Sequence, residues 1–192
     1  MNTPLASTFE PASLRSSSLP LVGILMGSDS DLSVMKAAAE VLEKEFGIGS
    51  EVHTLSAHRT PDAVVKYVED AEKRGFKVFI CGAGGAAHLA GVVAAHTALP
   101  VVGVPMMNKA TAGIDALFST VQMPPGIPVA TVAINGAKNA GILAAQIIGA
   151  ADSGVRAKVT AYKEKMAMGV VKKDQELQEK GFKKYLEDHD LI

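Results

Sequence analysis

Five short apolar runs alternate along this chain with longer stretches of helical period, and this alternation constrains the fold more than any other feature. The first run, LVGILMG at 21–27, is apolar without alternation, as expected of a strand that is covered on both faces. In the next stretch, apolar residues recur at spacings of three and four, which predicts a helix that ends at Gly47. The other four runs are EVHTLSAH (51–58), KVFICGAG (77–84), LPVVGVPM (99–106) and IPVATVAI (127–134).

Helical stretches follow most of these runs. Thr60 and Pro61 are typical of a helix N-cap and first turn, a small-residue helix is expected up to Ala98, and another over 138–151. Strands that alternate with helices indicate a parallel, doubly wound sheet. The pattern leaves the strand order open, but five strands in this layout most often adopt the order 2-1-3-4-5. We therefore predict an α/β fold, a flavodoxin-like three-layer αβα sandwich with a five-stranded parallel sheet.

Three segments are expected from composition. Residues 1–19 are rich in Ser, Pro, Thr and Ala and are predicted to be a disordered leader, and 20–152 are predicted to form the α/β domain. Residues 153–192 are predicted to be a C-terminal helical extension that packs on a neighbouring subunit. For the first helix of the extension, packing on its own chain is equally favoured. Its apolar stripe consists of Val155, Val159, Tyr162 and Met166.

Bulk composition excludes several classes of protein. The chain has 192 residues, 48% of them hydrophobic, which is enough for one domain with a sizeable core. A formal net charge of −1 gives no positive electrostatic potential that would attract a polyanion, so we expect no nucleic-acid partner. The apolar runs are too short or too interrupted to cross a bilayer, and no membrane association is expected. The single cysteine, Cys81, cannot form an internal disulfide, and a cytoplasmic location fits best.

Two polar turns follow the first and second runs. In MGSDSD (26–31), free N–H groups and the Ser28 hydroxyl can hold a phosphate while Asp31 accepts from sugar hydroxyls, although simple helix capping explains the same residues. In SAHRTP (56–61), His58 supplies an imidazole, the side-chain type best suited to proton transfer, and Arg59 offers a planar fork for a phosphate or carboxylate. A turn histidine is often only a surface residue, but site residues gather on such loops.

A glycine-rich turn, GAGGAAH at 82–88, follows the third run and lets the backbone approach a ligand closely. It matches neither GxGxxG nor GxxxxGK[ST], which disfavours dinucleotides and nucleoside triphosphates. His88 is expected to orient or contact a ligand, and a purely structural role is equally favoured. Because all three turns follow parallel strands, they should meet at one edge of the sheet.

Other reactive residues are expected to be structural. No histidine among His53, His96 and His189 has partners at metal-ligand spacing, so metal binding is not expected. Cys81 lies in an apolar run and is predicted to be a buried small hydrophobe. Asp115 could line the rim of a site or an interface, but a structural role is favoured.

Six motifs occur in the order MGSDSD, SAHRTP, GAGGAAHLAG, LPVVGVP, STVQMPPGIPVATVAI and KNAGILAAQI. In this set and order they closely resemble the N5-carboxyaminoimidazole ribonucleotide mutase family (class I PurE) of purine biosynthesis, over roughly residues 20–152. The resemblance implies a flavodoxin-like fold, a homo-octamer with sites at subunit contacts, and no metal or organic cofactor. It implies transfer of a carboxylate from the exocyclic nitrogen of an aminoimidazole ribonucleotide to ring carbon C4, by decarboxylation and recarboxylation.

The resemblance also implies roles for individual residues. His58 matches the general acid/base of the family. The predicted substrate-binding residues divide between the ribonucleotide and the imidazole with its carboxylate, and they are Ser28, Asp31, Ser56, Arg59, Gly84, Gly85, Ala87, His88 and Leu89.

Two alternatives stay open from the sequence. A sister class that carboxylates aminoimidazole ribonucleotide with CO2 resembles this chain but carries SAHKT and lacks the GAGGAAHL loop, so Arg59 and the intact loop favour the mutase. A flavodoxin-like module that only binds nucleotides could share the fold and the phosphate-binding turns, but it does not need His58.

Overall fold

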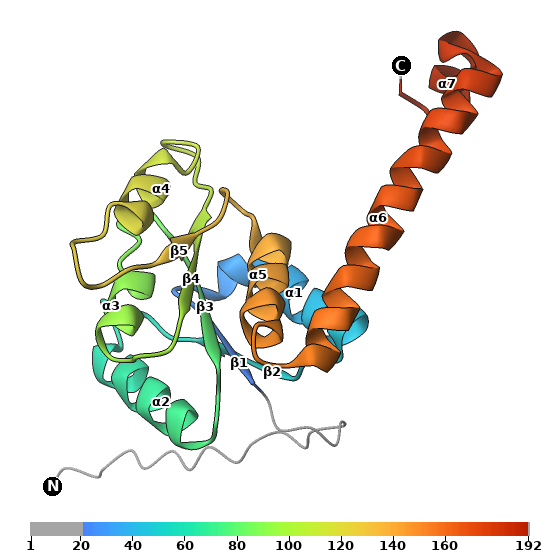
Figure 1. The fold of residues 1–192 in the computed structure, drawn as a ribbon. Coiled ribbons are helices and arrows are strands. Elements are labelled where there is room, and N and C mark those ends of the chain that lie inside the picture. The colour runs from blue at the N-terminus through green and yellow to red at the C-terminus, as the bar shows by residue number, and fades with distance from the viewer. Residues whose placement is uncertain (1–20, 192) are drawn as a thin grey trace, which may run out of the picture.

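The computed structural model describes residues 21–191 and contains one five-stranded parallel sheet with the order β2-β1-β3-β4-β5 (Figure 1). The predicted flavodoxin-like order is therefore confirmed, whereas the predicted leader at 1–19 lies outside the described residues. The strands are β1 (Val22–Met26), β2 (Ser50–Thr54), β3 (Val78–Gly84), β4 (Val101–Met106) and β5 (Ala130–Thr131).

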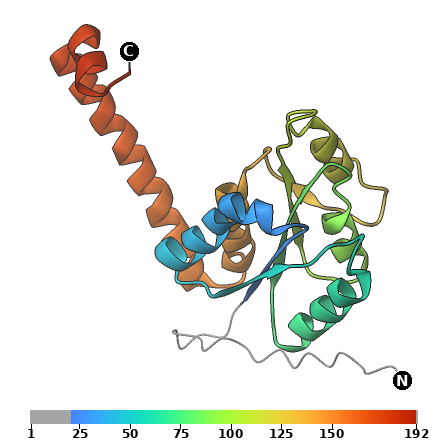
Figure 2. The same ribbon diagram turned by 180° about the vertical axis from the view of Figure 1, so that it is seen from behind.

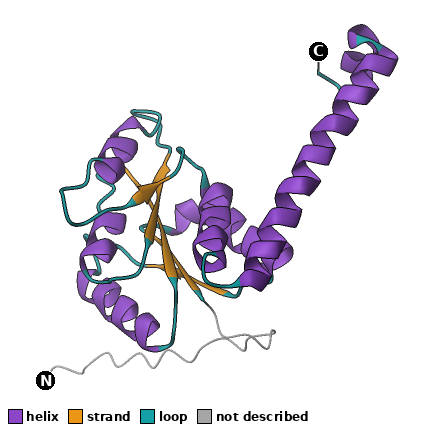
Figure 3. Cartoon of the chain, viewed as in Figure 1, coloured by secondary structure: helices purple, strands orange, loops and turns teal. Residues whose placement is uncertain are grey.

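Helices cover both faces of this sheet, which forms the central layer in Figure 3. One face carries α2, α3 and α4, and the other carries α1 and α5, as the views from front and back show (Figures 1 and 2). The helices are α1 (Leu32–Val41), α2 (Pro61–Lys73), α3 (Leu89–Ala95), α4 (Ile114–Val121), α5 (Ala137–Gly149), α6 (Ser153–Lys180) and α7 (Phe182–Asp188). No helix among residues 21–191 is both long enough and apolar enough to span a membrane.

The core consists of two apolar clusters, one on each side of the sheet. The first joins alternate residues of the central strands, such as Ile24, to α1 and α5. The second joins the opposite residues, such as Leu25 and Phe79, to α2 and α3. Helices α1 and α5 approach so closely that a Cβ at Gly141 would lie 2.8 Å from the Ala38 carbonyl oxygen. This sheet, buried on both faces, is a rigid support for the loops at its edge.

The first predicted helix is continuous to its predicted end, although its geometry changes. A π-helical turn, Leu42–Phe46, follows α1, and Gly47 ends it in the left-handed conformation with φ 65°. Glycine adopts this conformation without the steric cost of a Cβ, which explains the stop.

Two of the predicted strands are shorter than expected, and one helix was missed. β2 ends at Thr54, so residues 56–60 of the SAHRTP motif lie in the following loop and Pro61 begins α2. β5 comprises only Ala130–Thr131, because the chain turns where Gly136 N–H donates to the Ala133 carbonyl at 2.8 Å. Helix α4 was not predicted between the fourth and fifth strands, and its Ile114 and Phe118 side chains are exposed.

The C-terminal extension begins on its own domain and then leaves it. Val159 and Tyr162 on α6 are buried in the first core cluster, and the Tyr162 ring packs edge-on against Phe46 with centroids 5.4 Å apart. The Lys158 amino group donates to the Phe46 carbonyl at 2.8 Å and thereby caps the π-helical turn Leu42–Phe46. Beyond this point α6 projects away from the body, and α7 folds back at its tip (Figures 1 and 2). Packing of this projecting part on a neighbouring subunit stays a prediction.

Candidate functional site

A cavity of about 340 Å³ lies at the carboxyl ends of β1, β3 and β4 and beside the loop after β2. This is the switch point of the sheet, where open α/β folds bind ligands. The cavity brings together the three predicted motifs. Its lining residues are Gly27, Ser28, Ser30, Asp31, Ser56, Ala57, His58, Arg59, Ala83, Gly84, Ala86, His88, Leu89, Met106, Met107 and Asn108.

Two predicted binding residues do not line the cavity. Gly85 adopts φ 64°, and no neighbour lies within 4 Å of a Cβ built on it. Ala87 is 1% exposed, so its side chain belongs to the interior. Both residues shape the glycine-rich turn, which places Gly84, His88 and Leu89 at the cavity.

The first turn contains a helix-capping serine, Ser28, and an acid, Asp31, that has no ion-pair partner among the described residues. The Ser28 side chain accepts from Ser30 N–H at 3.3 Å and from the Ser30 hydroxyl at 2.9 Å, so Ser28 is a helix cap, and its role in binding a ligand stays a prediction. Burial raises the pKa of the Asp31 carboxyl, and the nearby Asp29 carboxylate adds to this rise although the Ser30 hydrogen bond opposes it. Among the described residues, Asp31 forms no ion pair. A ligand donor would therefore relieve the cost of its charge.

The SAHRTP turn is closed on itself by Thr60 and Ser56. The Thr60 hydroxyl accepts from Ser56 N–H at 2.9 Å and donates to the Ser56 carbonyl at 3.1 Å. Thr60 is the N-cap residue of α2 and Pro61 lies in its first turn, as predicted, but the Thr60 side chain makes no capping hydrogen bond. The hydroxyl satisfies the turn instead of the helix, because the Ser56 backbone competes for it.

Arg59 reaches from this turn to the first one. Its Nη2 donates to the Gly27 carbonyl at 2.6 Å, and its Nε donates to the Ser56 hydroxyl oxygen at 3.3 Å. The Arg59 backbone N–H also donates to the same oxygen at 3.2 Å. These bonds hold a fixed positive charge beside the end of β1, where an anionic ligand group can bind.

His58 and His88 form a direct hydrogen bond across the cavity. His58 Nε2 lies 2.8 Å from His88 Nδ1, and the two rings are nearly perpendicular, at 76°. One proton lies between these nitrogens, since two facing N–H groups would repel each other. In the neutral pair, the other ring N–H is on His88 Nε2 if His58 donates, or on His58 Nδ1 if His88 donates. The pair can take up and release a proton while the two rings hold each other in place.

The fourth wall of the cavity was not predicted. Met106, Met107 and Asn108 come from the end of β4, and this position after a parallel strand is the signal that could have identified them. The Asp115 carboxylate accepts from Asn108 Nδ2 at 2.9 and 3.0 Å. Asp115 thus fixes a lining residue, which agrees with the structural role predicted for it.

The other reactive residues lie away from this cavity. Cys81 is buried in β3, and burial raises the pKa of its thiol, as predicted for an unreactive core cysteine. His53 lies 3.6 Å from Glu51 at the edge of the sheet. Within residues 21–191 no group of three or more His, Cys, Asp or Glu side chains is arranged to hold a metal ion.

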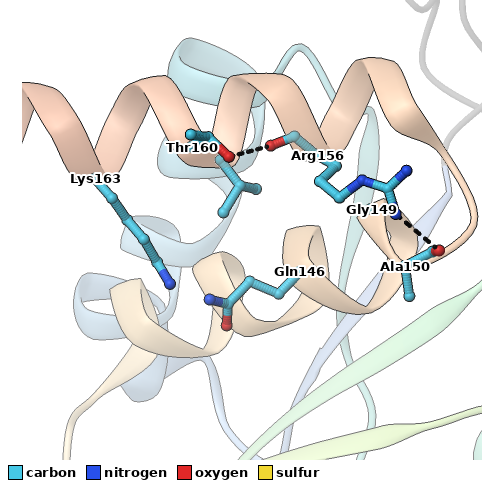
Figure 4. Close-up of a pocket in the computed structure, with 7 residues that line it drawn as sticks. Gln146, Gly149, Ala150, Arg156, Thr160 and Lys163 are labelled. Carbon is cyan, nitrogen blue, oxygen red and sulfur yellow. Dashed lines mark hydrogen bonds between the residues drawn. The ribbon is translucent and has the colours of Figure 1, made fainter.

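A second hollow of about 240 Å³ lies between α5 and α6 (Figure 4). Two of its lining side chains, Arg156 and Thr160, are committed to backbone carbonyls of Ala150 and Arg156. Among the lining residues that the structure describes there is no acid or histidine, so none of them is suited to transfer protons near neutral pH. The cavity at the strand ends is the candidate active site.

The fold and the cavity define an α/β protein with a histidine-containing site at the switch point of a flavodoxin-like sheet. The AIR carboxylase family matches residues 21–168, and the chain belongs to this family. It is 59% identical over 168 residues to the N5-carboxyaminoimidazole ribonucleotide mutase of Thermotoga maritima, covering 88% of this chain and 98% of that one.

A second relative is similar in sequence, and a solved structure is similar in fold. The mutase of Pyrococcus horikoshii is 53% identical over 169 residues, covering 88% of this chain and 95% of the relative. A crystal structure of PurE from Treponema denticola superposes with a TM-score of 0.76 at 34% identity, covering 82% of this chain and 98% of that one. The predicted family membership is therefore confirmed.

Proposed function

We propose that this protein is an N5-carboxyaminoimidazole ribonucleotide mutase, an isomerase that forms 4-carboxyaminoimidazole ribonucleotide in purine biosynthesis. The observation that carries the proposal is the hydrogen-bonded pair of His58 and His88 in a cavity that also contains an arginine and a carboxylate. Relatives that match nearly the whole chain bear the same name.

The polar side of the cavity suits a ribonucleotide. Arg59 offers a fixed positive charge for the phosphate, and the hydroxyls of Ser28 and Ser56 lie beside it. Asp31, which has no cationic partner among the described residues, accepts hydrogen bonds from the ribose hydroxyls. Anchoring at two points keeps the imidazole aligned through both halves of the reaction.

His58 serves as the general acid and then as the general base. The bond between the exocyclic nitrogen and the carboxylate breaks, CO2 leaves, and His58 gives a proton to the nitrogen. Ring carbon C4 then attacks the same CO2, and its proton returns to His58. His88 orients the His58 ring, because its Nδ1 lies 2.8 Å from His58 Nε2.

The apolar side of the cavity suits the retention of CO2. Gly84, Ala86, Leu89 and Met106 line it and solvate a carboxylate poorly, which favours its departure as neutral CO2. Nearby backbone N–H groups stabilise the negative charge that forms again on recarboxylation. We propose that Gly85 and Ala87 contribute through the shape of this turn.

The assembly and the location are part of the same proposal. Ile114, Phe118 and Val121 form an exposed apolar stripe on α4, and α6 exposes Met168 and further apolar residues. Such surfaces favour burial against other copies of the chain, in keeping with a homo-octamer, and the cytoplasm is the proposed location. Light scattering after gel filtration should give eight times the chain mass of 19.9 kDa. A monomer at micromolar concentration contradicts the octamer.

The role of His58 is tested by the substitution His58→Asn. Because general acid/base catalysis contributes about 10²–10⁴-fold, we expect turnover of N5-carboxyaminoimidazole ribonucleotide to fall by at least about 100-fold. Binding of the product, measured by calorimetry, should change little. His96→Asn is the matched control, since His96 is exposed and does not line the cavity. Turnover of His58→Asn within tenfold of the wild type contradicts the assignment.

A further inference from the structure

Asn135 lies between β5 and α5 and makes two hydrogen bonds to the end of β4. Its backbone N–H donates to the Pro105 carbonyl at 2.9 Å. Its side-chain Oδ1 accepts from the Met107 N–H at 2.9 Å. Asn135 is not among the residues that line the cavity, but both of its partners lie at the end of the strand that forms the fourth wall.

These two bonds replace a missing stretch of β5. Strand β5 pairs with β4 only where Ala130 faces Val102 and Thr131 faces Gly103. The turn at Gly136 then carries the chain away, so β4 continues without a strand neighbour on this side. Backbone N–H and C=O groups that lose a ladder partner need another one. Asn135 supplies it with one backbone donor and one side-chain acceptor.

The residue type fits this position in two ways. Asn135 has φ 57°, a left-handed conformation that asparagine tolerates better than most residues. Its side chain is also short enough to place an acceptor beside a neighbouring backbone N–H. Aspartate shares both properties, whereas glycine shares only the conformation, so substitutions can separate the two.

The bond to Met107 bears on the cavity directly. The wall that lines the cavity together with the histidine-bearing turns consists of Met106, Met107 and Asn108. The Asp115 carboxylate accepts a hydrogen bond from the Asn108 side chain. We propose that Asn135 is a positioning residue that keeps this wall in place and thereby sets the affinity for the ribonucleotide. The inference rests on the proposed mutase function, because it concerns the wall of that active site.

Steady-state kinetics with N5-carboxyaminoimidazole ribonucleotide test the inference. Loss of one hydrogen bond in Asn135→Gly should raise KM about 3- to 10-fold while kcat stays within about twofold. Asn135→Asp keeps the acceptor and should restore KM to within about twofold of the wild type. Ala112→Gly is the matched control, since Ala112 also has a positive φ, 52°, and does not line the cavity.

Each outcome decides the inference. An unchanged KM in Asn135→Gly, an equal loss in Asn135→Asp, or an equal loss in Ala112→Gly overturns it. A purely structural role lowers the melting temperature and the active fraction but leaves KM unchanged. In the wild type, the Met107 amide must exchange slowly with deuterium, and fast exchange also overturns the proposal without any variant. An inactive wild type refutes the proposed function instead, so the two failures are distinguishable.

Discussion

Docking of α6 on its own domain predicts a large loss of stability when Tyr162 is truncated. Tyr162 is 7% exposed and packs edge-on against Phe46 in the first core cluster. Replacing a buried aromatic side chain by alanine typically costs about 3–5 kcal/mol, because apolar contact is lost and a cavity remains. For a chain of this size, each kcal/mol lowers the melting temperature by about 2–4 °C. Tyr162→Ala should therefore melt roughly 6–20 °C below the wild type.

The assay is thermal unfolding followed by far-UV circular dichroism at one fixed chain concentration, since association shifts the apparent stability. Tyr162→Phe keeps the ring and should melt close to the wild type. Glu164→Ala, an exposed position on the same helix, should change the free energy of unfolding by no more than about 0.5 kcal/mol. A Tyr162→Ala protein that melts with the wild type refutes the packing of α6 on this core.

Two carboxyl groups give predictions with opposite pH dependence. The raised pKa of Asp31 means that its ionised form is less favourable in the folded state, so Asp31→Asn should raise the melting temperature at pH 7.5 and lower kcat/KM. The gain in melting temperature should vanish below about pH 3.8. An unchanged melting temperature at pH 7.5 contradicts this prediction. Burial alone would raise the pKa of Glu51, but hydrogen bonds at 2.5 and 2.9 Å and the charge of Arg74 lower it below 4.5. The stabilisation that ionised Glu51 contributes is therefore present above pH 4.5 and lost as the pH falls. The free energies of unfolding in urea of the wild type and Glu51→Gln should differ at pH 7 and converge at acid pH. A difference that stays constant with pH contradicts the pairing of Glu51 with Arg74.

The sheet was predictable because its central strands are buried on both faces. β1 and β4 are buried along their whole length, which gives apolar runs without alternation. Strand order follows from the preference of five-stranded doubly wound sheets, and it places the three motifs at one edge. The location of the site therefore followed from the topology.

Finer features depend on contacts between segments that are distant in the sequence. The bond between His58 and His88 joins residues 30 positions apart and requires both turns to fold. The early end of β5 depends on the turn at Gly136, and the missing capping bond of the Thr60 side chain depends on competition from Ser56. No local pattern encodes these contacts, because each is decided by tertiary geometry.

The central claim is that the cavity transfers a carboxylate within one ribonucleotide. The direct measurement mixes the wild-type protein with N5-carboxyaminoimidazole ribonucleotide and, separately, with aminoimidazole ribonucleotide plus bicarbonate, and follows the C4-carboxylated product by absorbance. Fast conversion of only the first substrate is the predicted result. Fast conversion of the second contradicts the mutase and indicates a carboxylase that uses CO2, while no conversion of either contradicts catalysis and favours a nucleotide-binding module.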